Sequence, residues 1–516
     1  MEVLSLLSTG MLLALQPLNL ALILIGVSVG LFIGAMPGLG SVNGVAILLP
    51  VTFLVPPSGA IIFLAAIYYG AMYGGAISSI TLGIPGASTA VATTFDGRPL
   101  ARQGRASLAL VTAALASFVG GTVANVLFTL FAPLLADVAL SFGPPEVFAL
   151  MLLAFATFIG LGGDDIPKTI FSICFGLVLG AVGFDQISGA PRLVLFDING
   201  FLQGIGFLVL AIGVYGIGEM LWTIEQARGE VKTTTPKMTL KGMAADTREA
   251  GSQGWKGTAI GSFLGFFVGV LPAAGATPGS LMAYGVAKMT SRRPEEFGRG
   301  NPDGVAAPEA ANNSASTGSM LPMLTLGIPG SPTTAILLGG MVIWGLVPGP
   351  RLFVDETEFV WGLIGSFYIS NVAALLINLA FIPVFIWMLR MPFSILAPMI
   401  FVLSITGGYA ATRDMFDVWL MVIFGLGAFF LRKFDYPLAP AVLAIVLGPI
   451  AEPTLRQSLL LSSGDPSIFF TRPVAGPITI VALILIFLPA VKLLRRKKRG
   501  KGLDGEQGGE TAAPRR

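Results

Sequence analysis

Long apolar runs, separated by short polar segments, occupy most of this sequence of 516 residues. A run of about 20 apolar residues is long enough to cross the hydrocarbon core of a bilayer as a helix. The candidate spans are 106–130, 146–162, 169–184, 201–222, 360–387, 392–411, 419–431, 437–450 and 477–494. The pattern therefore predicts an all-α polytopic membrane protein.

Gly and Pro interrupt four further apolar regions, which are 18–56, 59–95, 255–289 and 305–347. The four breaks are MPGLGSVNG from Met36, TLGIPGAST from Thr81, LPAAGATPG from Leu271 and TLGIPGSPT from Thr325. Unpaired backbone groups are costly in hydrocarbon, so such breaks persist only where protein buries them or where they line a cavity. The alternative explanation is that Gly and Pro merely permit kinks or close helix packing.

The breaks recur in the same order, which indicates an internal duplication. Segment 30–44 matches 265–279 at a constant offset, and TLGIPG occurs at both 81–86 and 325–330. Chance repetition in a sequence rich in Gly and Ala is the alternative. The predicted organisation is an N-terminal interfacial or short membrane helix, repeat 1, a cytoplasmic linker, repeat 2 and a basic disordered tail. The corresponding boundaries are 1–17, 18–224, 225–256, 257–494 and 495–516.

Basic residues change places between the two repeats. In repeat 1 three Arg follow the second break, within 98–105, and the loop between the breaks, 51–58, is uncharged. In repeat 2 four basic residues lie between the breaks, within 288–299. Because Lys and Arg favour cytoplasmic loops, the repeats are predicted to have inverted topology, as in many secondary transporters. Threading the spans from this start places the linker and the C-terminus in the cytoplasm, and 137–146, 185–197 and 453–473 outside.

In inverted-repeat transporters, paired breaks meet near the midplane of the membrane. Half-helix N-termini there face anionic groups of the substrate, and freed carbonyls coordinate Na+. Ser and Thr that follow a break are suited to cap the half-helices or to bind an anion. We therefore predict substrate binding by Gly38, Gly40, Ser41, Asn43, Gly86, Ser88, Thr89, Gly275, Thr277, Asn312, Asn313, Ser314, Gly330, Ser331 and Thr333. We predict cation coupling by Pro37, Gly83, Pro85, Pro272, Glu309, Gly327 and Pro329, with Na+ held by backbone carbonyls.

The segment PEAANNSASTGS, 308–319, is the most polar sequence expected at membrane depth. At helical spacing Glu309, Asn313 and Ser316 share a face. An acidic residue in the membrane is a functional candidate by default. The alternative is a glutamate at the water interface near a helix start, which Pro308 would favour. Repeat 1 carries Tyr68, Tyr69 and Tyr73 in the equivalent place, so the predicted site is asymmetric.

Composition supports the membrane assignment and excludes several kinds of functional site. The chain is 54% hydrophobic and 11% charged, with a mean hydropathy of +0.82, whereas soluble domains carry about 25% charged residues. The formal charge of +3 is too small to indicate nucleic acid binding. The chain has no His and only Cys174, which excludes an imidazole relay, an intrachain disulfide and a zinc site built on cysteines.

Motifs for enzymatic chemistry are missing from the sequence. It contains no P-loop and no HExxH motif, so we predict no enzyme and no cofactor, and expect an ion gradient to supply the energy. No Lys or Arg lies in any of the four breaks. An anionic substrate would then be held by helix N-termini, amide N–H groups, hydroxyls and bound Na+, without salt bridges.

Four stretches carry a family resemblance: GAMPGLGSVNGVAILLP, DGRPLARQGRA, PEAANNSASTGSMLPMLTLGIPGSPTTAILLGG and GPIAEPTLRQSLLLSSGDPSIFFTRP. They resemble the large membrane subunit of bacterial tripartite tricarboxylate transporters, the TctA family, over about 18–494. The resemblance implies an inner-membrane permease that moves its substrate by an elevator motion. It also implies a small TctB-like membrane subunit and a periplasmic TctC-like binding protein as partners. The implied activity is Na+- or H+-driven uptake of citrate or related tri- and dicarboxylates.

Other interpretations stay open at the level of the sequence. A membrane scaffold or sensor would bind an anionic ligand at the breaks without translocating it, and a channel would need no binding protein. The segment 455–473 is expected either to contact a partner subunit or to serve only as a connecting loop. A homo-oligomer is compatible with the sequence.

Overall fold

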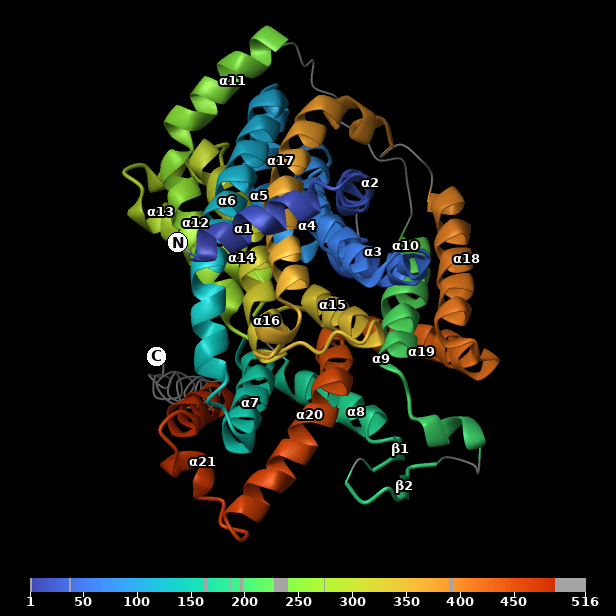
Figure 1. Ribbon diagram of the computed structural model, residues 1–516. Coiled ribbons are helices and arrows are strands. Elements are labelled where there is room, and N and C mark those ends of the chain that lie inside the picture. Colours follow the sequence, from blue (N-terminus) through green and yellow to red (C-terminus); the bar gives the residue numbers. More distant parts are fainter. Residues whose placement is uncertain are drawn as a thin grey trace, which may run out of the picture.

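The computed structural model describes residues 2–36, 39–161, 165–185, 187–194, 198–226, 240–272, 274–388 and 393–487. Most of these residues are helical (Figure 1). Seven of the described helices are long and apolar enough to cross a membrane: Pro17–Ala35, Pro57–Thr81, Ala106–Ala139, Phe207–Glu225, Thr357–Trp387, Met415–Lys433 and Ala439–Leu461. This agrees with the predicted all-α polytopic class.

The chain order of the elements is as follows. The part before the linker contains α1 (Glu2–Ala14), α2 (Pro17–Ala35), α3 (Gly40–Leu48), η1 (Leu49–Leu54), α4 (Pro57–Thr81), η2 (Ser88–Ala90), α5 (Val91–Arg102), α6 (Ala106–Ala139), α7 (Pro144–Leu161), α8 (Ile166–Gly180), β1 (Gly183–Phe184), β2 (Pro191–Arg192), η4 (Asn199–Gln203), α9 (Phe207–Ala211), the π-helical η5 (Ile212–Gly218) and α10 (Glu219–Gln226). The remainder contains α11 (Leu240–Gln253), α12 (Trp255–Val270), α13 (Ala276–Thr290), η6 (Pro294–Glu296), α14 (Pro302–Leu326), α15 (Pro332–Ile343), α16 (Leu352–Asp355), α17 (Thr357–Met388), α18 (Phe393–Thr412), α19 (Met415–Lys433), α20 (Ala439–Leu461) and α21 (Ile468–Thr471). Strands β1 and β2 form a short antiparallel pair.

Helices α4 and α14 form the centre of the molecule and are buried along nearly their whole length. Each packs closely against a glycine-rich helix, α4 against α2 and α14 against α12. A Cβ atom added at Gly30 would lie 2.2 Å from the carbonyl oxygen of Ile67, and one at Gly269 would lie 2.3 Å from that of Ala315. Small residues thus bring the two backbones of each pair together, as is usual between membrane helices.

Two segments that were expected to be loops are partly helical. The linker contains α11, which packs against α6 and is held there by the Arg105–Glu249 ion pair and by a hydrogen bond from Ser107 to Asp246. Helix α20 continues through Pro449 and Pro453 to Leu461, so the predicted outer segment 453–473 begins as helix. An internal Pro removes one helical hydrogen bond, and packing of α20 against α7 and α8 compensates for this loss.

The segment before Leu18 forms α1, which packs against α17 with Gly10 touching the backbone at Trp361. A helix was predicted there, and its relation to the membrane surface stays a prediction. The predicted disordered tail, 495–516, lies outside the described residues, and so do Pro37 and Gly38 of the first break.

Candidate functional site

Each of the four breaks separates two helical segments. The first lies between α2 and α3, the second between α4 and α5, the third between α12 and α13, and the fourth between α14 and α15. Gly40 and Gly275, at matching positions of the first and third breaks, have φ of 61° and 67°. Gly83 and Gly327, at matching positions of the second and fourth, have φ of 73° and 71°. This left-handed conformation favours glycine, which explains why these positions carry it.

Hydroxyl groups connect the breaks crosswise. Ser41 Oγ in the first break lies 2.9 Å from Thr333 Oγ1 in the fourth. Ser88 Oγ in the second break lies 3.0 Å from Thr277 Oγ1 in the third. Each pair joins residues from the two halves of the chain, and all four were predicted to bind substrate. The structure therefore brings the predicted residues of different breaks into direct contact.

The described residues of the fourth break form several hydrogen bonds. Ser331 and Thr334 form a reciprocal capping box at the start of α15, in which Ser331 Oγ accepts from Thr334 N at 3.2 Å and Thr334 Oγ1 accepts from Ser331 N at 2.8 Å. The hydroxyl of Tyr68 on α4 lies 3.2 Å from Ser331 Oγ. The N–H of Gly275 donates to the carbonyl of Gly330 at 2.9 Å, which ties the third break to the fourth.

Most of the other predicted break residues are enclosed by protein. The buried ones are Gly40, Asn43, Gly86, Pro272, Gly275, Gly327, Pro329 and Gly330. Gly83, Pro85 and Thr89 are half-buried. Close packing explains part of this, because a Cβ atom on Gly86 would lie 2.0 Å from the carbonyl oxygen of Gly34. Their proposed roles in binding substrate or cation stay predictions.

The polar residues of α14 point to different neighbours. Asn312 donates through Nδ2 to the carbonyl of Met72 on α4 at 3.1 Å, whereas Ser314 donates to the carbonyl of Ser262 on α12. Asn313 donates to the carbonyl of Glu309 at 3.3 Å. All three are fully buried. Helical geometry spreads consecutive residues around the axis, so these three are distributed over several helix interfaces.

Glu309 is also fully buried. Its Oε1 accepts a hydrogen bond from Thr93 on α5, and its Oε2 accepts one from Ser117 on α6 at 3.3 Å. Helix α14 begins at Pro302, and Pro308 lies inside it. The alternative of a glutamate at a helix start in the water interface is therefore wrong.

Arg98 is a residue that the sequence argument missed. It lies outside the break motifs, yet its side chain packs beside Gly83 and donates to the carbonyl of Thr81, at the C-terminal end of α4. A guanidinium is therefore present beside the second break, although the break sequence itself contains no Lys or Arg. The signal available in the sequence was the position of Arg98, just beyond the break in the DGRP segment.

A second group that was missed is a buried polar cluster between α4, α6, α14 and α17. Tyr69 donates to Asn125 Oδ1 at 2.5 Å and lies 2.6 Å from Thr317 Oγ1. Tyr73 donates to Asn371 Oδ1 at 2.6 Å. Tyr69 and Tyr73 were noted from the sequence only as the counterpart of the α14 segment. Asn125 and Asn371 are single polar residues within apolar runs. The pattern of hydrophobic and polar positions therefore gave no sign of the cluster.

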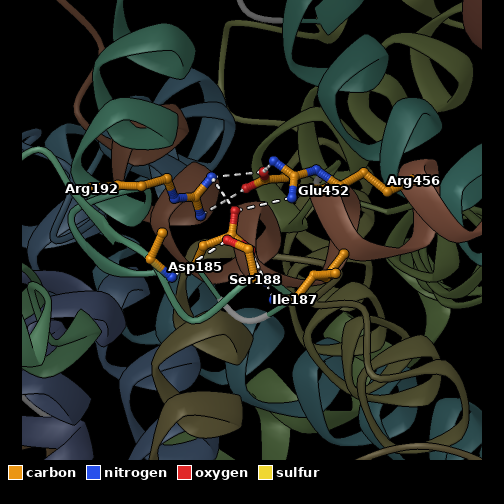
Figure 2. A network of polar contacts seen from close by, with 7 residues as sticks. Asp185, Ile187, Ser188, Arg192, Glu452 and Arg456 are labelled. Carbon is orange, nitrogen blue, oxygen red and sulfur yellow. Dashed lines mark hydrogen bonds and ion pairs between the residues drawn. The ribbon is translucent and has the colours of Figure 1, made fainter.

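A charged network joins the β1–β2 region to α20 (Figure 2). Asp185 lies 3.4 Å from Arg192 and 3.0 Å from Arg456, and Glu452 lies 2.8 Å from Arg192 and 2.6 Å from Arg456. The backbone N–H of Ser188, with further hydrogen bonds and the two arginines, holds the pKa of Asp185 well below its usual range. These four side chains line a pocket, and two segments that were both predicted to lie outside the membrane meet there.

Comparison with known proteins identifies the family. The model of the tripartite tricarboxylate transporter TctA family matches residues 20–443. The chain is 37% identical over 498 residues to an Agrobacterium vitis protein described as an uncharacterized 52.8 kDa protein in the TAR-I ttuC′ 3′ region, covering 96% of this chain and 98% of that protein. It is 36% identical over 234 residues to an uncharacterized Agrobacterium vitis protein in the TAR-II ttuC′ 3′ region, covering 45% of this chain and 97% of that protein. No solved structure matches the chain. The chain therefore belongs to the tripartite tricarboxylate transporter TctA family, a family of membrane transporters and not of enzymes.

Proposed function

We propose that this protein is the large permease subunit of a tripartite secondary transporter, which imports tri- and dicarboxylates such as citrate across the bacterial inner membrane. A small TctB-like membrane subunit and a periplasmic TctC-like binding protein would complete it. An Na+ or H+ gradient would drive uptake. The observation that carries the proposal is the crosswise pairing of the breaks, Ser41 with Thr333 and Ser88 with Thr277.

The four breaks are suited to hold a carboxylate without a dedicated salt bridge. Helices α3, α13 and α15 begin at or just after a break, so backbone N–H groups of their first turns and their positive dipole ends lie beside the hydroxyl pairs. The freed carbonyls of the breaks provide oxygen ligands for Na+. Arg98 adds one positive charge near the second break.

The proposed architecture is a pair of inverted repeats that move as an elevator. Support comes from the matching φ angles of Gly40 and Gly275, and of Gly83 and Gly327. Further support comes from the equivalent packing of α2 on α4 and of α12 on α14. An elevator motion would carry the paired breaks across the membrane as one unit.

Two ion pairs each join segments that were predicted to lie on the same side of the membrane. Arg105 pairs with Glu249, and both lie in segments predicted to be cytoplasmic. Arg472 pairs with Glu146 at 3.5 Å, and both lie in segments predicted to be outside. Helix α11 and the β1–β2 region lie at opposite ends of the molecule in Figure 1.

The test is uptake of labelled citrate and other di- and tricarboxylates into cells that express this chain. The small subunit and the binding protein are each present or omitted, with and without a Na+ or pH gradient. Uptake that requires both partners and one gradient is expected. If the correctly inserted protein binds a carboxylate but takes up none, the chain is a ligand-binding membrane protein and not a transporter.

A further inference from the structure

We propose that the coupling cation, Na+ or H+, neutralises Glu309 in a site completed by the hydroxyls of Thr93 and Ser117. This inference rests on the proposed transport function and adds to it the ligands of the cation. Three helices meet at the site, because Thr93 belongs to α5, Ser117 to α6 and Glu309 to α14.

Glu309 lies in the protein interior without an ion-pair partner among the described residues. Glu309 is fully buried, and within the described chain no Lys or Arg forms an ion pair with it. A carboxylate without a positive partner is costly to bury, and two hydroxyl hydrogen bonds offset only part of that cost. A bound monovalent cation would remove the charge.

Oxygen atoms of neighbouring side chains surround the carboxylate of Glu309. Thr93 and Ser117 each place a hydroxyl oxygen against Glu309. The side chain of Asn313 lies one helical turn further along α14, and its Nδ2 donates to the backbone carbonyl of Glu309. Its Oδ1 is buried and accepts no hydrogen bond from the described residues. Carboxylate, hydroxyl and amide oxygens are the ligands that hard cations prefer, and a proton on Glu309 would use the same hydroxyls as partners.

The other titratable groups near this site already have partners. Asp96 on α5 accepts from the backbone N–H groups of Gly298, Gly300 and Asn301, and from the hydroxyl of Tyr284 on α13 at 2.9 Å. Tyr73 on α4 donates to Asn371. Helix α6 contributes the hydroxyl of Ser117. Glu309 is therefore the group whose charge a mobile cation has to balance.

Helix α5 connects the Glu309 site to the proposed substrate site. Thr93 lies in the first turn of α5, directly after the second break. Ser88, five residues earlier in the chain, pairs with Thr277 of the third break. A cation at Glu309 would hold α5 against α14 and so fix the half-helix that follows Ser88. Cation binding and substrate binding would then stabilise the same arrangement of the second break, which is the basis of coupling.

The test uses the complete transporter in proteoliposomes, with Glu309→Gln and Thr93→Val. Substrate accumulation is measured under a Na+ gradient alone and under a pH gradient alone, and counterflow is measured without a gradient. Glu309→Gln is expected to lose accumulation under the gradient that drives the natural protein, while counterflow persists. Thr93→Val keeps the charge and is expected to raise the half-saturating cation concentration about tenfold, because it removes a hydrogen-bonding group from a charged one. The gradient to which Glu309→Gln becomes insensitive identifies the cation.

Glu296→Gln, which removes an exposed acid that pairs with Arg293, serves as the control and is expected to behave like the natural protein. Accumulation by Glu309→Gln equal to that of the natural protein would overturn the inference. If Glu309→Gln also loses counterflow, Thr93→Val decides, and an unchanged half-saturating concentration overturns the inference. Absence of counterflow in the natural protein would count against the proposed transport function itself.

Discussion

Single hydroxyl groups make two of the contacts between the breaks, so the proposed site depends in part on a few small side chains. Ser41 and Thr333 are both buried and face each other across the two halves of the chain. A buried polar group that loses its partner costs about 1–3 kcal/mol. Removing either hydroxyl takes a hydrogen-bond partner from the other, so the effects of the two changes should not add.

Ser41→Ala and Thr333→Val are each expected to raise the KM for carboxylate uptake about tenfold, as the loss of one buried hydrogen bond of about 1.5 kcal/mol suggests. The double variant should be no worse than either single variant. Initial uptake rates over a range of substrate concentrations measure this. Ser28→Ala is the matched control, because the Ser28 hydroxyl donates to the carbonyl of Leu24 in its own helix and forms no other hydrogen bond among the described residues. Additive effects of the two changes would show that the pair does not act as a unit.

The sequence located the hydroxyl residues beside the breaks. It did not predict which of these residues contact each other. Repetition of Gly and Pro motifs located Ser41, Ser88, Thr277 and Thr333, since motif positions are a property of the chain. Their crosswise pairing depends on how the halves pack. The contacts of Glu309 with Thr93 and Ser117 and of Arg98 with Thr81 join residues that no local pattern relates.

At the scale of elements, glycine sets the distance between paired helices. Gly265 and Gly269 lie one turn apart on α12 and both touch the backbone of α14. Membrane helices gain little from burying apolar surface against each other, so close van der Waals contact carries the association. The sequence shows this spacing, but it does not show which helix is the partner.

Gly269→Ala is expected to destabilise the protein by about 1–3 kcal/mol, because the new methyl group would lie 2.3 Å from the carbonyl oxygen of Ala315 and force α12 away from α14. Gly285→Ala on α13 is the matched control, since nothing lies within 4 Å of its added Cβ atom. It is expected to be neutral or slightly stabilising. Thermal unfolding of the purified variants in detergent compares them. Equal unfolding temperatures would mean that the α12–α14 contact adapts easily.

Proline and polar composition misled the sequence argument at α20 and α11. Both features lower helix propensity, and tertiary packing overrode that preference in each case. Helix α20 rests against α7 and α8, and α11 rests against α6. The sequence of a segment does not show which helices will pack against it.

At the scale of the whole molecule, the ion pairs separate into two groups. Arg192, Arg456 and Arg472 pair with acids in or beside segments predicted to be outside. Arg105 and Lys433 pair with acids in segments predicted to be cytoplasmic. Within the described part of the chain, no ion pair joins the two groups. Charges on opposite sides of a bilayer cannot meet, so this separation is what the proposed topology requires.

Labelling of single cysteines tests that topology. In a Cys174→Ser background, Gln457→Cys on α20 and Arg292→Cys before α14 each introduce a thiol at an exposed position. Gln457 is uncharged, and Arg292 forms no ion pair within the described chain. The ion pairs next to them in sequence belong to Arg456 and Arg293. A membrane-impermeant maleimide should label Gln457→Cys in intact cells and should label Arg292→Cys only after the membrane is opened, because basic loops stay on the cytoplasmic side. The unmodified Cys174→Ser protein measures background labelling. Labelling of both positions from the same side would contradict the predicted topology of repeat 2, since the two lie in segments that it assigns to opposite faces.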